Sequence, residues 1–278
     1  MSWTQVSYCY DGSFAGFLSC VFDSYANREA PASFSTPEEP QISLWPERQA
    51  ATHLERAQRV YRSVAARISP QAQVLVRRGF LTCLPERELY LWNFLRLGYR
   101  QGARVTQDLT SDWVHGLTKA VYQLEHEAHM YKGFVRFSDQ AGFLVAQIAP
   151  KNRVLPLLGP HFSARFPQET FVIYDQSHLE ALIHQSGAWT ITGAEDFQPG
   201  DPTQEELSYR RLWKRFYDTI AIEGRINPTL RRSHMPKRYW GLLTELQPEP
   251  DPQGLTSRTY MAYSSNVCRL SATKPNSV

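Results

Sequence analysis

Apolar residues in the first half of the chain recur mostly at every third or fourth position, a spacing typical of helices that bury one face. A short strand over residues 6–10 precedes them, followed by the turn Asp11-Gly12 and by Ser13, a favourable helix N-cap. The periodic segments predict helices over residues 14–25, 47–68, 71–80, 85–102 and 108–131. We therefore expect a helix-rich N-terminal half, with a second short strand over residues 42–45.

The hydrophobic pattern changes after Gly133. Short apolar or alternating runs, separated by turn residues, predict strands over residues 134–137, 143–148, 171–174, 180–184 and 189–192. A segment bounded by prolines, residues 156–167, interrupts them with the helical motif HFSARF. The predicted fold class is α+β, with a helix-rich N-terminal half, a small central antiparallel sheet and a basic helical C-terminal section.

A chain of 278 residues is long enough for one large domain or for two that share an interface. We predict a single globular α+β unit over residues 1–246, with a candidate sub-boundary near residue 132. Residues 247–278 hold four prolines and many Ser, Thr and Asn without a sustained periodicity. This composition predicts a disordered tail.

Positive charge is concentrated near the C-terminal end of the predicted unit. Residues 209–240 contain nine Arg or Lys and two acids, a local charge of +7, whereas the whole chain carries +3. The rest of the chain is therefore about −4. A basic segment on a nearly neutral body favours a polyanionic partner.

Periodicity places this charge on helices. Over residues 209–220 the apolar positions share one arc and are expected to pack, so that the basic positions face outward. Pro236 suits the first turn of a second helix with Tyr239 and Leu243 on its apolar face, and a helix N-terminus favours an anion. The residues predicted to bind phosphate are Arg210, Arg211, Lys214, Arg215, Arg231, Arg232, Lys237 and Arg238, with His234 as an additional contact. A solvated face with scattered salt bridges is the alternative. Tyr217, Tyr239 and Trp240 could stack on a base, although aromatic residues at helical spacing are more often core residues.

Motifs for nucleotide-driven or metal chemistry are missing from the sequence. There is no phosphate-binding P-loop, no Rossmann fingerprint, no Gly-x-Ser-x-Gly and no C-x-x-C, so we predict no cofactor and no metal site. Asp11, Asp175 and Glu223 lie at element ends, where carboxylates usually cap. Whether the protein is an enzyme stays open. The candidates for a hidden catalytic site are His129, His161, Arg165 and His234.

The sequence also indicates the compartment. No signal peptide or apolar stretch of membrane-spanning length is recognisable, and the four cysteines suit a reducing environment as buried free thiols. We therefore expect a cytoplasmic, bacterial-type protein without a membrane partner.

Four segments resemble a known family: YDGSFAGFLSCVFDSY (10–25), HEAHMYKGFVRF (126–137), NRVLPLLGPHFSARFP (152–167) and IAIEGRINPTLRRSHMPKRYW (220–240). They are similar to a bacterial family of uncharacterised DNA-metabolism or DNA-repair proteins that are encoded beside a radical S-adenosylmethionine (radical-SAM) protein, and in some of which the same region is fused to a uracil-DNA glycosylase-like domain. The resemblance spans roughly residues 6–246. It implies DNA and a radical-SAM protein as partners, and it supplies no catalytic residue, although Arg136 and several of the candidates above lie in the matching segments.

Three functions follow from these observations. The first is a nucleic-acid-binding factor that acts with a radical-SAM partner, and it predicts salt-dependent binding. The second is an enzyme acting on damaged or modified DNA. The third is a protein-binding adaptor for the radical-SAM enzyme without affinity for DNA of its own. Sequence alone does not distinguish DNA from RNA and does not identify a lesion or an oligomeric state.

Overall fold

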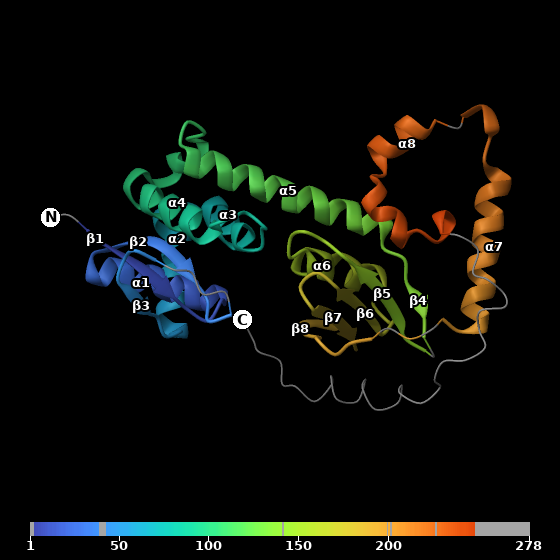
Figure 1. Cartoon of the computed structure of the whole chain (residues 1–278), viewed down its shortest axis with the longest axis horizontal. Coiled ribbons are helices and arrows are strands. Elements are labelled where there is room, and N and C mark those ends of the chain that lie inside the picture. Colours follow the sequence, from blue (N-terminus) through green and yellow to red (C-terminus); the bar gives the residue numbers. More distant parts are fainter. Residues whose placement is uncertain are drawn as a thin grey trace. The chain divides into compact units, whose positions relative to one another are not determined.

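The computed structural model describes residues 3–38, 43–140, 142–198, 200, 202–225 and 227–247 (Figure 1). Its mixture of helices and two separate sheets confirms the α+β class. The described residues divide into two units: those up to residue 126 together with 151–153 form one, and residues 127–150 together with those from 154 to 247 form the other. This division and the sub-boundary predicted near residue 132 both fall within the same helix, α5 (Asp112–Phe134). Residues 248–278, nearly all of the predicted tail, lie outside the described residues.

The first unit begins with a parallel sheet. Strands β1 (Thr4–Cys9), β2 (Glu29–Ser35) and β3 (Glu47–Gln49) are arranged in the order β2-β1-β3. Parallel neighbours need a long crossover, which α1 (Phe14–Asn27) supplies between β1 and β2. Strand β3 lies after the position predicted for it, since Ser43–Trp45 are not in a strand and residue 42 lies outside the described residues.

The turn between β1 and α1 is held by Asp11. Its carboxylate accepts hydrogen bonds from the Ser13 backbone N–H (2.9 Å), the Ser13 hydroxyl (2.7 Å) and the Thr52 hydroxyl (2.7 Å), while Ser13 caps the helix through Gly16 N–H. A side chain at Gly16 has no room, because its Cβ would lie 2.1 Å from Asp11 Oδ1. Burial raises the pKa of Asp11, but the hydrogen bonds from Thr52 and Ser13 outweigh it and hold that pKa below the ordinary value.

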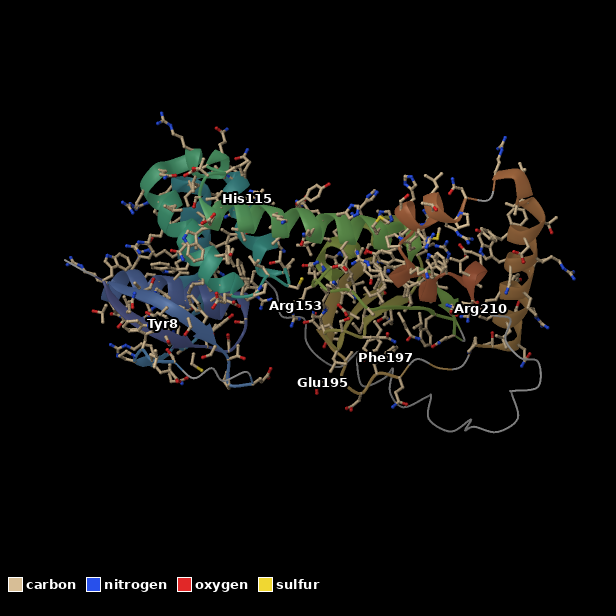
Figure 2. All side chains as sticks on the ribbon, turned by 45° about the horizontal axis from the view of Figure 1, so that its top comes forward. Tyr8, His115, Arg153, Glu195, Phe197 and Arg210 are labelled. Atoms are coloured by element: carbon tan, nitrogen blue, oxygen red, sulfur yellow. The ribbon has the colours of Figure 1, made fainter. Side chains whose placement is uncertain are left out.

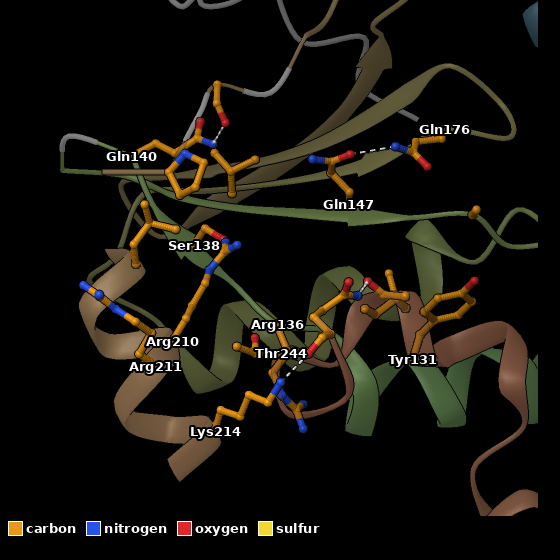
Figure 3. A pocket seen from close by; sticks show the side chains of 18 of the residues that line it. Tyr131, Arg136, Ser138, Gln140, Gln147, Gln176, Arg210, Arg211, Lys214 and Thr244 are labelled. Carbon is orange, nitrogen blue, oxygen red and sulfur yellow. Dashed lines mark hydrogen bonds between the residues drawn. The ribbon is translucent and has the colours of Figure 1, made fainter. Parts of the chain in front are cut away.

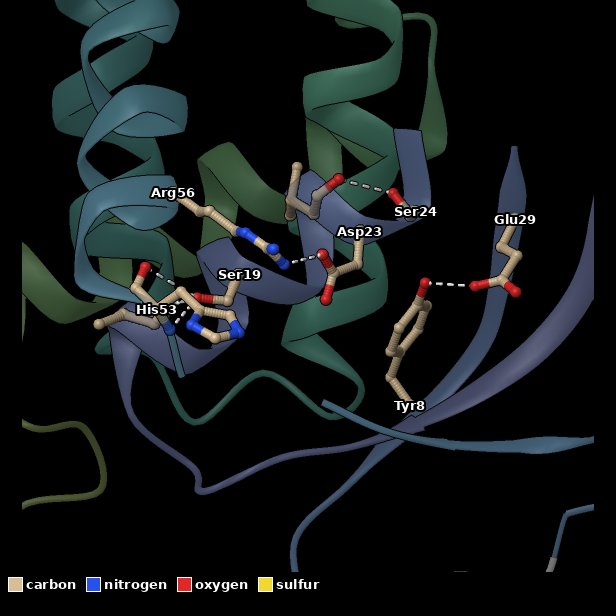
Figure 4. A network of polar contacts seen from close by, with 9 residues as sticks. Tyr8, Ser19, Asp23, Ser24, Glu29, His53 and Arg56 are labelled. Atoms are coloured by element: carbon tan, nitrogen blue, oxygen red, sulfur yellow. Dashed lines mark hydrogen bonds and ion pairs between the residues drawn. The ribbon is translucent and has the colours of Figure 1, made fainter. Parts of the chain in front are cut away.

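Polar contacts join the elements of this unit (Figure 4). The Ser19 hydroxyl on α1 accepts a hydrogen bond from the His53 backbone N–H (3.0 Å), and Tyr8 donates to the buried Glu29 (2.7 Å). Asp23 and Arg56 form an ion pair of 2.9 Å. These contacts fix α1 against the segment that enters α2 (Leu54–Arg67) and β1 against β2.

Helices complete the first unit as the periodicity predicted. They are α2, α3 (Pro70–Phe80), α4 (Arg87–Gln101), the 3-10 helix η1 (Gly102–Gln107) and the first part of α5. Trp92 is fully buried among them, and its indole N–H donates to Ser24 (3.0 Å). The predicted helix over 47–68 is shorter in the structure, because residues 47–49 pair with β1 instead.

The second unit contains a five-stranded sheet in the order β4-β5-β6-β7-β8. Its strands are β4 (Ser138–Asp139), β5 (Leu144–Ile148), β6 (Phe171–Asp175), β7 (Glu180–Gln185) and β8 (Ala188–Gly193). The sheet is mixed and not purely antiparallel as predicted, because β5 and β6 are parallel. The intervening α6 (Leu155–Arg165) returns the chain to the end of the sheet at which β5 begins, so the proline-bounded segment is a crossover.

Helix α6 packs against β7 and β8. Gly159 permits this approach, since a Cβ at that position would lie 2.8 Å from the Trp189 ring. On a further part of the sheet, Phe197 (Figure 2) packs its ring 5.0 Å from that of Tyr174. Strand β6, in the middle of the sheet, is buried throughout, whereas β8 at one end of the strand order is mostly exposed.

The basic C-terminal section consists of α7 (Gln204–Ile220), η2 (Glu223–Arg225), α8 (Pro228–His234), η3 (Lys237–Leu242) and η4 (Thr244–Leu246). The helix predicted from Pro236 is a 3-10 helix; Tyr239 within it and Leu243 directly after it are buried as expected. Among the described residues, no helix combines the length and apolarity that crossing a membrane requires. Cys9, Cys20 and Cys83 are free thiols, of which Cys83 is exposed, and Cys268 lies outside the described residues.

Candidate anion-binding cavity

A cavity of about 660 Å³ lies in the second unit, between the sheet and the C-terminal section (Figure 3). Its volume falls within the range of about 300–1,000 Å³ that is usual for small-molecule sites. Five cationic side chains line it: Arg136, Arg210, Arg211, Lys214 and Arg238. None of the described residues that line it is acidic. The cavity is therefore suited to an anion.

Helix α7 supplies three of the cations. Arg210 pairs with Glu206 one turn earlier (2.7 Å) and also donates to Ser138 of β4. Lys214 donates to the backbone oxygen of Gln247 (2.8 Å), and Arg211 donates to the Ser208 hydroxyl (3.2 Å). Within the described part of the chain, no carboxylate lies within ion-pair distance of Arg211 or Lys214. Their charge is available to a ligand.

Arg136 follows the end of α5 and is oriented by Glu245. The two side chains form an ion pair of 3.1 Å, and the same carboxylate accepts a hydrogen bond from the Trp213 indole (3.0 Å). Burial raises the pKa of Glu245. The hydrogen bonds from its own backbone N–H and from Trp213, together with the charge of Arg136, outweigh the effect of burial and hold this pKa below its ordinary value of 4.5. The ionised Glu245 thus joins η4 to α7 and to Arg136.

Arg238 lies on η3 and is near the buried Glu127 of α5, with 3.8 Å between guanidinium and carboxylate. Its guanidinium also donates to the Tyr239 hydroxyl (2.6 Å) and lies 4.7 Å from the centre of that ring. Three of the five lining cations pair with carboxylates, those of Glu206, Glu245 and Glu127. The cations and these carboxylates together have a net charge of +2. The carboxylates orient the cations without neutralising the cavity.

Amide side chains form another part of the wall. Gln176 donates from Nε2 to Gln147 Oε1 (2.6 Å), and the buried Gln140 donates to the Gly200 backbone oxygen (3.0 Å). Figure 3 shows these glutamines on the strands and loops of the sheet, whereas Arg210, Arg211 and Lys214 project from α7. The cavity therefore has a cationic side and a neutral hydrogen-bonding side.

The eight residues predicted to bind phosphate divide into two groups. Arg210, Arg211, Lys214 and Arg238 line the cavity, and Arg215, Arg231, Arg232 and Lys237 do not. In the second group, Arg231 and Lys237 lie over the Trp240 ring, at 5.3 and 5.9 Å from its centre. The structure thus brings half of the predicted residues together at one site.

The orientation predicted for α7 is wrong. Its apolar arc was expected to pack, but Tyr209, Leu212 and Phe216 are 62%, 62% and 51% exposed, and Trp213 and Ile220 are also exposed. Arg210 and Lys214 are only partly exposed and contact Ser138 and Gln247. Polar anchors from the sheet and the C-terminal segment determine which face of α7 is turned inward, and periodicity does not detect them.

The surroundings of Arg231, Arg232 and His234 also differ from the prediction. They lie in the last turn of α8, where the helix dipole favours cations, and not around a helix N-terminus. His234 is exposed and does not line the cavity. Of the aromatic residues considered for stacking, Tyr239 is fully buried and belongs to the core.

The four catalytic candidates lie outside the cavity lining. His129 is exposed on α5, Arg165 is exposed at the end of α6, and His161 is partly buried on α6. Burial, followed by the charges of Lys132 and Arg165, lowers the pKa of His161, which favours its neutral form. The described residues contain no cluster of His, Cys, Asp and Glu that could hold a metal ion.

Of the carboxylates expected to cap, Asp11 holds the first turn as described. Asp175 accepts hydrogen bonds from the backbone N–H groups of Ser177 (2.9 Å) and His178 (3.2 Å), and it is also a capping group. The side chain of Glu223 is not among those that the structure describes.

Sequence reasoning missed several cavity residues. Arg136 stands out only as part of a matching segment, and Gln140, Gln147 and Gln176 belong to no motif or charge cluster. Single polar residues at strand ends give no periodic signal, so only the position of the strands in the sheet identifies them as neighbours.

Residues 85–245 match the family model described as a domain of unknown function, DUF4130. The match includes every residue that lines the cavity except Gln247. A comparison with curated proteins found no match.

Proposed function

The chain belongs to the DUF4130 family, and we propose that this member is a DNA-metabolism or DNA-repair factor that binds nucleic acid through the cation-lined cavity and the surrounding C-terminal section. The observation that carries the proposal is the set of five cations around a cavity with no acidic residue in its described lining. Phosphate groups, like carboxylates, are anions that guanidinium groups bind in a two-pronged geometry. Further cations of the C-terminal section, such as Arg215 and Arg232, are exposed, and a polyanion longer than the cavity would have them available as additional contacts.

The cellular context is part of the same proposal. The resemblance described above implies a radical-SAM protein as the partner and, in some members, fusion to a glycosylase-like domain. We propose that the chain presents nucleic acid to this partner in the cytoplasm. Any chemistry on the nucleic acid would then be carried out by the partner.

Fluorescence anisotropy with labelled single- and double-stranded DNA and RNA tests this function. We expect binding by the full chain at low salt and a linear fall of log K with log salt concentration, because phosphate contacts release counterions. The slope counts the contacts. Absence of binding to every nucleic acid at low salt would rule out the proposal.

The exposed apolar face of α7 favours a second candidate, an adaptor that binds the radical-SAM protein without binding DNA. Leu212, Phe216 and Ile220 are each more than half exposed. A patch of this kind is typical of a protein interface. Co-purification of the two proteins, lost on Leu212→Ser and Phe216→Ser and unaffected by nuclease, would support the adaptor. Salt-dependent DNA binding by the isolated chain would argue against it.

A further inference from the structure

We propose that the cavity takes a single unpaired nucleotide, with its phosphate on the α7 side and its base against the glutamines of the sheet. The inference rests on the proposed function and makes it more specific, since the recognised unit is a nucleoside monophosphate. Such a unit can come from a free nucleotide or from a nucleotide turned out of a strand. The experiment below separates the two sources.

The glutamine pair supplies the chemistry to recognise a base. Because the amide of Gln176 donates to the carbonyl oxygen of Gln147, the pair retains the carbonyl of Gln176 as an acceptor and the NH₂ group of Gln147 as a donor. If the direction of this hydrogen bond were reversed, with Gln147 donating to Gln176, the pair would still retain one free donor and one free acceptor. Adjacent donor and acceptor groups match the edge of a nucleobase. Both side chains are exposed, so they are accessible to a ligand.

Gln140 adds a fixed acceptor to this wall. Its amide N–H is held by the Gly200 backbone oxygen (3.0 Å), and the side chain is buried. A buried amide with one bonded end cannot rotate freely, so its remaining carbonyl oxygen keeps its direction. One acceptor on the base side of the cavity is therefore preorganised, which a merely electrostatic site does not need.

The cationic side supplies the phosphate contacts. Arg211 and Lys214 have no carboxylate partner among the described residues, and Arg210 is held in place by Glu206 and Ser138. In a duplex the pairing edge of each base is hydrogen-bonded to its partner and its faces are stacked on its neighbours, so the base cannot reach the glutamines. A nucleotide that has left the stack can do so. The apolar part of the lining, which includes Val145, Leu207 and Leu242, suits the faces of its base.

The test uses the full chain and an oligonucleotide that carries 2-aminopurine, whose fluorescence rises when the base leaves the stack. Single strands and duplexes with the probe paired or opposite a mismatch are titrated, with deoxynucleoside monophosphates and inorganic phosphate as competitors. The variant Gln147→Leu/Gln176→Leu is compared with Gln123→Leu, an exposed glutamine of the first unit. Circular dichroism confirms the fold of each variant.

We expect tighter binding of single strands and mismatched duplexes than of paired duplexes, with a rise in probe fluorescence. The double variant should lose about ten-fold in affinity, with an unchanged salt slope, because it removes base contacts only. The control should match the wild type.

The opposing results separate the two proposals. If the wild type binds in a salt-dependent way, and the double variant keeps both the affinity and the probe fluorescence of the wild type, the nucleotide site is overturned. The nucleic-acid function is then unaffected. Binding of free monophosphates without binding of any oligonucleotide supports the site and overturns the function. Competition by inorganic phosphate equal to that by monophosphates overturns the site, since the amides then contribute nothing.

Discussion

Replacing Arg211 and Lys214 by glutamate is expected to lower the affinity for single-stranded DNA by roughly 100-fold or more at low salt. A solvated charge pair about 4 Å apart is worth about 1 kcal/mol, so each reversal replaces an attraction with a repulsion of similar size. Neither side chain has a carboxylate partner among the described residues, so the change breaks no ion pair. It does remove the Lys214–Gln247 hydrogen bond that helps to hold α7, so circular dichroism must confirm that the variant keeps its fold. Anisotropy titrations at several salt concentrations measure the effect, and the salt slope should become shallower by about 1.4, or about 0.7 for each lost contact to a single strand.

The matched control is Arg62→Glu/Arg104→Glu. Both residues are exposed in the first unit, and the variant has the same net charge as the cavity variant. If the affinity depends only on total charge, the two variants will lose the same amount of affinity for DNA, and the cavity is not the binding site. A large loss in the cavity variant alone locates the nucleic acid at α7.

Removing the carboxylate of Glu245 is expected to release α7 and η4 from Arg136. The side chain is buried and accepts hydrogen bonds from Arg136 and Trp213. Hydrogen bonds to charged groups contribute about 1.5–3 kcal/mol, and Arg136, which is about one-third exposed, can recover part of its hydration. Glu245→Ala should therefore cost about 2 kcal/mol locally. Hydrogen exchange followed by mass spectrometry should show faster exchange over residues 204–220 and 236–247.

The same carboxylate makes this region sensitive to acid. Since the folded-state pKa of Glu245 lies below the ordinary value of 4.5, its ionised form stabilises the fold at any pH well above 4.5. That stabilisation is lost as the pH falls through the lowered pKa. Glu245→Gln removes the charge but keeps an acceptor for Trp213. The protection of its amides, measured relative to their intrinsic exchange at each pH, should therefore vary less over that acidic range than in the wild type.

Exposed carboxylates provide the control for this effect. Glu205 lies on the same helix and is exposed, so Glu205→Gln should leave both the local exchange rates and their acid dependence as in the wild type. Unchanged exchange over residues 204–220 in Glu245→Ala would show that this network does not hold α7.

Local signals explain the part of the fold that sequence predicted correctly. Ser13 caps α1, Pro70 begins α3, and the apolar spacing of α4 buries Leu91, Trp92 and Leu95. These features depend on residues within one or two turns of each other, so a linear pattern contains them. The α+β class followed from the change to short apolar runs after Gly133.

Long-range contacts explain what the pattern did not predict. The parallel pairing of β5 with β6 requires the crossover α6, and no residue in either strand encodes it. Helix α7 has a clear amphipathic period, but its inward face is chosen by Ser138, Gln247 and Glu245, which lie far from it in sequence. The exposed apolar arc is the result.

For the candidate site, the sequence by itself determined where the positive charge lies along the chain and therefore the class of partner to test. It identified four of the five cavity cations, because clustered charge is visible in a linear segment. Only the tertiary structure decided which cations share a cavity, added Arg136, and placed Gln140, Gln147 and Gln176 opposite them. The physical reason is that recognition of a small ligand depends on side chains converging in space, and strands that meet in a sheet bring together residues whose spacing in sequence has no period.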